Sequence, residues 1–147
     1  MRTALSFDDV LLVPRYSDIL SRKEINIKQN LKSVGDFSLP IIASPMDTVT
    51  ETDMAAMGVG DDFISRSMNL VDAGVSFLCI DVAHGHHAKV RYALEALRNT
   101  FGDDLHIMAG NVATLEAFDA LASWGADSVR VGIGGGSICS TRIVTGH

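Results

Sequence analysis

The residues best suited to chemistry lie in one stretch near the C-terminal end of the sequence, GIGGGSICSTR at residues 132–142. Its four glycines allow positive φ angles and a close approach of the backbone to a ligand, and their N–H and C=O groups can bind an anion or a cation. Cys139 lies among these amide dipoles and near Arg142, an environment that favours the thiolate, the form that attacks carbon. We therefore take Cys139 as a candidate nucleophile.

The same stretch also has a plainer interpretation. Segments rich in glycine and serine are often flexible loops, and an isolated cysteine is often a small core residue. The stronger phosphate-binding patterns are missing, because the stretch contains neither GxxxxGK[ST] nor a GxGxxG that opens a helix. The residues of the loop leave both interpretations open.

Apolar runs of strand length alternate with helix-like segments upstream of this loop. The expected strands are 40–46, 75–81, 105–111 and 127–133. Strands that are apolar throughout, separated by helices, are typical of βαβ units in a parallel sheet. A complete TIM (β/α)8 barrel needs about 250 residues, so we predict an α/β fold that forms the N-terminal half of such a barrel.

Four helices are expected around these strands, the first of them in 50–57 (TETDMAAM), where Thr50 and Asp53 can form its start. The predicted buried faces of the other three are Phe63, Ile64, Ser67, Met68 and Val71, begun by Asp61; Val90, Ala93, Leu94, Leu97 and Phe101, in a helix from about His87 to Phe101; and Leu115, Phe118, Leu121 and Ala122, begun by Thr114. Gly74, Gly102 and Gly125 are placed to end them. Residues 1–39 are expected to be a lead-in, with a short strand at 25–27, that covers one end of a single domain spanning 1–147, whose βα units occupy 40–147.

Polar or glycine-rich residues follow all four expected strands. Ligands gather at the C-terminal ends of parallel strands, so Ser44, Asp81, Asn111 and the Cys139 loop should lie at one end of the sheet. Asp81 closes an apolar strand, where a carboxylate needs a cleft or a partner, although it could instead cap the following helix.

Composition narrows the class of protein. A hydrophobic content of 47% supports a packed core, and a net charge of −6 argues against a nucleic-acid-binding face or a polybasic membrane anchor. No run approaches the about 18 apolar residues that a membrane span requires, and no secretion signal is apparent at the start. Cys79 and Cys139 have no metal-ligand spacing and fit a reducing compartment, so we predict a cytoplasmic protein.

Five motifs together resemble those of the IMP dehydrogenase/GMP reductase family. In chain order they are SFDDVLLVPRYSDILSR, PIIASPMDTVTE, CIDVAHGHH, IMAGNVAT and VGIGGGSICSTR. The resemblance implies a purine nucleotide oxidoreductase that acts on a purine nucleoside 5′-monophosphate, with NAD or NADP as cofactor, and a homo-oligomer like the tetramers of the family. Some motifs look more like the dehydrogenases and IMAGNVAT looks as much like the reductases, so both activities stay open, with the dehydrogenase favoured.

The resemblance also implies roles for individual residues. Cys139 matches the nucleophile that adds to C2 of the purine, and Thr141 matches a residue of the chemistry that follows. The remaining matches are Ser44, Met46, Asn111 and Ser137 for substrate binding, Asp81 near the nicotinamide ribose of the cofactor, and Gly134, Gly136 and Cys139 as backbone ligands of a monovalent cation such as K+. For His84, His86 and His87, a solvated loop or helix start is favoured over a metal site, and Cys79 is expected in the core.

The sequence departs from the family in two places. Met57 runs directly into Gly58, where family members have a further strand, helix and strand, and the second half of the barrel does not follow His147. We therefore expect an internal deletion, and an inactive fragment that serves as a binding or assembly module remains a rival hypothesis. A small phosphate-binding α/β protein of flavodoxin-like size would explain the glycines but not Cys139.

Overall fold

The computed structural model describes residues 10–43, 54–135 and 139–146. Its strands are β1 (Gln29–Leu31), β2 (Gly35–Phe37), β3 (Met54–Met57), β4 (Phe77–Asp81), β5 (His106–Val112) and β6 (Ser128–Val131). Its helices are α1 (Phe63–Asp72), α2 (Ala88–Phe101), α3 (Leu115–Ser123) and α4 (Thr141–Thr145), and a 3-10 turn lies at Arg22–Glu24. None of the helices in these described ranges has the length and apolar character of a membrane span.

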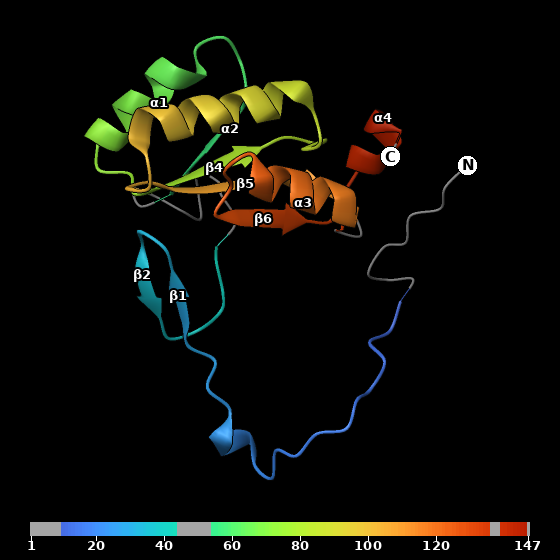
Figure 1. The fold of residues 1–147 in the computed structure, drawn as a ribbon. Coiled ribbons are helices and arrows are strands. Elements are labelled where there is room, and N and C mark those ends of the chain that lie inside the picture. Colours follow the sequence, from blue (N-terminus) through green and yellow to red (C-terminus); the bar gives the residue numbers. More distant parts are fainter. Residues whose placement is uncertain (1–9, 44–53, 136–138, 147) are drawn as a thin grey trace.

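Four strands form one parallel sheet in the order β3-β4-β5-β6, so each strand pairs with the next one along the chain. Helices α1, α2 and α3 connect successive strands and pack against the same face of the sheet (Figure 1). Sequential parallel strands with helices on one face are the arrangement of a partial (β/α)8 barrel. The predicted α/β fold is confirmed.

The core lies between this face of the sheet and the helices. Alternate residues of the two central strands point into it, and Leu78, Ile80 and Ile107 are completely buried there. Helix α2 adds Leu94 and Leu97, which are also completely buried, as its periodicity predicted. Burial of one such side chain contributes about 1.5–3 kcal/mol, so β4, β5 and α2 form the stable centre of the fold.

The opposite face of the sheet meets a hairpin formed by β1 and β2. The ring of His106 is buried there, with Nδ1 2.8 Å from the carbonyl oxygen of Lys32 in the hairpin turn and Nε2 2.6 Å from Oγ of Ser128 on β6. Phe77 contacts the same ring edge-on, with centroids 4.7 Å apart. Within the described part of the lead-in, residues 10–39, the hairpin contacts the sheet, whereas residues 10–28 are exposed and extend away from it (Figure 1).

Two secondary-structure predictions at the start of the fold are wrong, and a third is wrong for the part of it that the structure describes. Met54–Met57 is strand β3 rather than part of a helix, because its two methionines are buried and its backbone pairs with β4, a tertiary gain that outweighs local helix propensity. Residues 25–27 form no strand. The first strand is β1, and the chain turns after it, where Ser33 and Gly35 have φ angles of 64° and 122°. Of the expected strand 40–46, residues 40–43 are not in a strand and 44–46 lie outside the described residues.

The buried faces of α1 and α3 are narrower than predicted. In α1, Met68 is 48% exposed, and Asp62 rather than Asp61 is the N-cap residue. In α3, Leu121 is buried but Leu115 is 74% exposed and Phe118 is 40% exposed, and Ala122 is exposed as well. Strand β6 is the edge of the described sheet, so no further βα unit covers the outer side of α3.

Candidate active site

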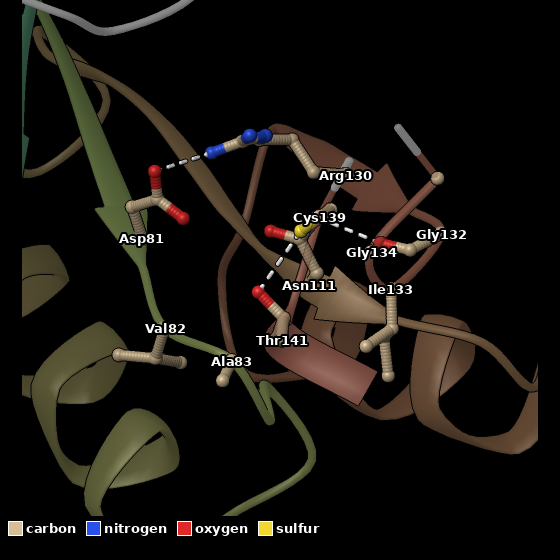
Figure 2. A pocket seen from close by; sticks show the side chains of 11 residues that line it. Asp81, Val82, Ala83, Asn111, Arg130, Gly132, Ile133, Gly134, Cys139 and Thr141 are labelled. Carbon is tan, nitrogen blue, oxygen red and sulfur yellow. Dashed lines mark hydrogen bonds and ion pairs between the residues drawn. The ribbon is translucent and has the colours of Figure 1, made fainter. Parts of the chain in front are cut away.

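A cleft lies at the C-terminal ends of β4, β5 and β6 (Figure 2). Its volume is about 350 Å³, within the usual range for small-molecule sites. The residues that line it are Asp81, Val82, Ala83, Asn111, Arg130, Gly132, Ile133, Gly134, Gly135, Cys139 and Thr141. Three strand ends and the loop after β6 thus meet where a parallel sheet is expected to bind its ligand.

On one side of the cleft, the last residue of β4 forms an ion pair with a residue of β6. Nη1 of Arg130 lies 2.8 Å from Oδ2 of Asp81, and both side chains are only partly exposed. Burial tends to lower the pKa of Arg130, but the hydrogen bond and negative charge of Asp81 outweigh it and raise that pKa. The guanidinium therefore remains a permanent positive charge at the edge of the cleft.

The base of the cleft contains an amide acceptor that lacks a partner. Nδ2 of Asn111 donates to the carbonyl oxygen of Gly132 at 2.7 Å, which fixes the side chain against the loop. Oδ1 of Asn111 is buried and accepts no hydrogen bond from any described residue. A buried acceptor without a donor costs about 1–3 kcal/mol, so this oxygen is suited to a donor group on a ligand.

The nucleophile candidate is on the other side of the cleft, just before α4. Cys139 is exposed, and its Sγ lies 3.1 Å from Oγ1 of Thr141. A thiolate has no proton to give, so in that state the hydroxyl of Thr141 must be the donor in this contact. The pair can therefore stabilise the attacking form of Cys139.

The structure brings together five of the residues predicted for the site: Asp81, Asn111, Gly134, Cys139 and Thr141 all line the cleft. The other four, Ser44, Met46, Gly136 and Ser137, lie outside the described residues, as does the side chain of Arg142. The prediction that Ser44, Asp81, Asn111 and Cys139 lie at one end of the sheet is confirmed for the last three, and Ser44 lies outside the described residues. The roles of the individual residues stay predictions.

Arg130 is the cleft residue that the sequence-based prediction missed. It lies within strand β6, and a charged side chain that is partly buried in a strand requires a partner or a cleft. The same argument did single out Asp81, so the signal was present in the sequence. Only the strand order makes the two residues partners.

Outside the cleft, Cys79 lies in the core as expected, and two of the three neighbouring histidines make contacts within the chain. Cys79 is completely buried, and burial raises the pKa of its thiol, while nearby Arg130 lowers it in part. His87 caps α2 by accepting a hydrogen bond from the backbone N–H of Lys89, and His86 lies against the ring of Trp124. The described residues contain no group of three side chains that could hold a metal ion.

Comparison with known proteins identifies relatives of this chain. The sequence model of the IMP dehydrogenase / GMP reductase domain matches residues 4–57 and 54–147. Inosine-5′-monophosphate dehydrogenases of Mycobacterium tuberculosis (strain ATCC 25618 / H37Rv) and Bacillus subtilis (strain 168) are 50% and 51% identical over 92 residues, or 63% of this chain. The enzyme of Nitrosopumilus maritimus is 42% identical over the same length.

The match to these relatives is partial. The aligned 92 residues span 17% of the mycobacterial enzyme and 19% of the Bacillus enzyme, so the chain spans less than a fifth of the length of the curated relatives it matches. The two segments that match the domain model overlap at residues 54–57, next to the place where a deletion is expected. Together they cover nearly the whole sequence, and the chain therefore belongs to the IMP dehydrogenase/GMP reductase family.

Proposed function

We propose that this chain carries the cysteine-bearing part of a purine nucleotide oxidoreductase site of the IMP dehydrogenase type. The observation that carries the proposal is the shared cleft: a cysteine with a hydroxyl partner, an unsatisfied amide acceptor and a carboxylate line one space. The substrate would be a purine nucleoside 5′-monophosphate, with C2 of the base placed at Sγ of Cys139.

Cys139 supplies the nucleophile in this proposal. Its thiolate forms an S–C2 bond with the purine as the C2=N3 π electrons move to N3. The hydrogen on C2 then departs as a hydride while the C2=N3 π bond re-forms, so the purine is oxidised by two electrons. Water must next attack C2 and release Cys139. Before attack, the hydroxyl of Thr141 can donate a hydrogen bond to the thiolate, which stays ionised.

The other residues of the cleft bind and orient. Oδ1 of Asn111 is a buried acceptor that suits a hydroxyl or N–H of the substrate. Ser137, Ser44 and Met46 are proposed for the phosphate and the base on the strength of the family motifs. Glycines let a backbone approach a phosphate closely, and Gly132 and Gly134 of this loop have φ angles of 114° and 59°.

A nicotinamide cofactor would accept the hydride. The residues present fit such a group, since Asp81 places a carboxylate at the edge of the cleft and a carboxylate pairs well with the hydroxyls of a ribose. NAD is favoured over NADP because the relatives matched are IMP dehydrogenases. A monovalent cation such as K+ is bound by carbonyl oxygens, and the proposed ligands are the backbone carbonyl oxygens of Gly134, Gly136 and Cys139.

Two alternatives remain. GMP reductase activity would use the same cysteine and carry the hydride from NADPH to C2 of GMP, with loss of ammonia. The other alternative is a catalytically inactive module. It is favoured by strand β6, which is the edge of the sheet among the described residues, because unpaired strand edges can pair with another chain.

Protection of the thiol tests the proposal directly. Iodoacetamide labelling of Cys139 in the purified chain is measured by mass spectrometry with IMP, with GMP and without nucleotide. We expect IMP to slow labelling of Cys139, and we expect Ser140→Ala, a change beside the nucleophile, to preserve this protection. Equal labelling in the presence and absence of both nucleotides would refute the purine site and favour the inactive module.

A further inference from the structure

A row of three residues crosses the sheet at the edge of the cleft. Asp81 on β4 pairs in register with Gly110 on β5, and Gly110 pairs with Arg130 on β6. All three lie on the face of the sheet opposite the helices, because Ile80 and Ala109, their neighbours along the strands, point into the helix-covered core. Arg130 therefore reaches Asp81 across the middle strand, over a position without a side chain.

The glycine in the middle of this row is required by space. A Cβ atom at position 110 would lie 2.6 Å from Cβ of Arg130 and 2.8 Å from its carbonyl oxygen, closer than real Cβ contacts. One of the two conflicting atoms belongs to the backbone of β6, so rotation of the arginine side chain cannot relieve the conflict. Any larger residue at position 110 must push Arg130 away from Asp81.

We propose that Arg130 is a positioning residue for Asp81, and that the absence of a side chain at Gly110 lets the two residues meet across β5. The guanidinium binds Oδ2 of Asp81, and the second carboxylate oxygen is turned into the cleft, where a ligand can use it (Figure 2). Cys79, two residues before Asp81 on the same face, lies 3.8 Å from the same Nη1 and helps to fix the guanidinium. Arg130 thus fixes the direction in which Asp81 presents its remaining oxygen.

The ligand-directed part of this inference rests on the proposed function, but the row itself does not. It is tested by a double-mutant cycle in urea unfolding with Asp81→Asn, Arg130→Met and the double variant. A partly exposed ion pair predicts a coupling of about threefold in the unfolding equilibrium constant. Repeated in a Gly110→Ala chain, the cycle should give no coupling.

Gly58→Ala is the matched control, because a Cβ there meets no atom within 4 Å. The coupling should survive in this background. The proposal is overturned if the coupling persists in Gly110→Ala. It is also overturned if the original chain shows no coupling, and this second test does not require Gly110→Ala to fold.

Binding of NAD, measured by calorimetry on the same proteins, tests what the row does. We expect Asp81→Asn and Arg130→Met each to weaken binding about three- to tenfold, the double variant to be no weaker than Asp81→Asn, and Arg130→Lys to recover part of the loss. Additive losses would mean that Arg130 contacts the ligand itself, which contradicts a positioning role. If the unchanged chain binds no NAD, the proposed function fails. The unfolding cycle still tests whether Arg130 and Asp81 interact across Gly110.

Discussion

The two cysteines of this chain should differ greatly in reactivity toward a small alkylating agent. Cys139 is exposed beside the cleft, whereas Cys79 is completely buried in β4, a central strand of the sheet. An alkylating agent can reach Cys79 only after β4 separates from its neighbours. We therefore expect labelling of Cys139 long before labelling of Cys79.

The size of the difference follows from the cost of that opening. A buried central strand opens only in the most costly local or global unfolding events, and even a marginal domain has a free energy of unfolding of about 5 kcal/mol. Each 1.4 kcal/mol is about a factor of ten in an equilibrium constant, so Cys79 is accessible about a thousandth of the time or less. The thiol of Cys79 also has a raised pKa because it is buried, which slows its reaction further.

The assay is limited alkylation with iodoacetamide at neutral pH, quenched at intervals and read by peptide mass spectrometry. Single Cys79→Ser and Cys139→Ser variants show that each peptide reports on its own thiol, and urea above the unfolding midpoint should bring the two rates together. Comparable rates in the folded protein, or faster labelling of Cys79, would refute the assignment of β4 to the core or of Cys139 to an open loop.

The same burial predicts a pH dependence of stability. The pKa of Cys79 is raised above its ordinary value of 9.0, so the folded state retains the thiol proton at pH values where the unfolded chain loses it. This contribution to stability is fully present below about pH 9 and is lost as the pH rises toward the folded pKa. Cys79→Ala should therefore lose less stability than the unchanged chain between neutral and alkaline pH in urea unfolding; an equal loss would contradict the raised pKa.

Three further predictions follow from the packing and the site. His106→Phe should lower the free energy of unfolding by about 1–3 kcal/mol, because it leaves polar groups of the hairpin turn and of Ser128 without a partner, and adding Ser128→Ala should recover part of that loss; strictly additive effects would contradict the contact. Leu121→Ala should lower the free energy of unfolding by about 2–5 kcal/mol, whereas Phe118→Gln on the exposed side of α3 should lower it by under about 0.5 kcal/mol. Similar losses for the two variants in urea unfolding would mean that α3 is covered on both sides. The 147-residue chain alone should turn over IMP with NAD far more slowly than an intact relative, because positioning contributes about 7–11 kcal/mol to catalysis, and robust turnover abolished by Cys139→Ala would contradict this.

Much of the central fold could be predicted from local sequence patterns. Helix α2 has its apolar residues at helical spacing, a predicted start near His87 and a predicted end at Gly102, and the structure has all three, with His87 as the N-cap residue. The strand predictions at 75–81 and 105–111 hold to within two residues, because both runs are short and mostly apolar. Such local signals are reliable where the segment is also buried on both sides by its neighbours, as β4 and β5 are.

The errors occur where tertiary contacts decide the outcome. Met54–Met57 is a strand because β4 offers it a pairing edge, which no local propensity reveals. The apolar residues of α3 that the helical period assigned to the core include Leu115, which is exposed because no further unit covers the edge of the sheet. Periodicity identifies a face of a helix, but it does not say whether anything packs against that face.

The candidate site shows the same division. The types and spacing of residues were enough to single out Asp81, Asn111 and Cys139 and to place them at the ends of strands, because a parallel sheet brings these ends to one edge. The pairing of Arg130 with Asp81 depends on which strands are neighbours, on their register and on the missing side chain at Gly110. Those are relations between residues far apart in the chain, so only the tertiary structure could decide them.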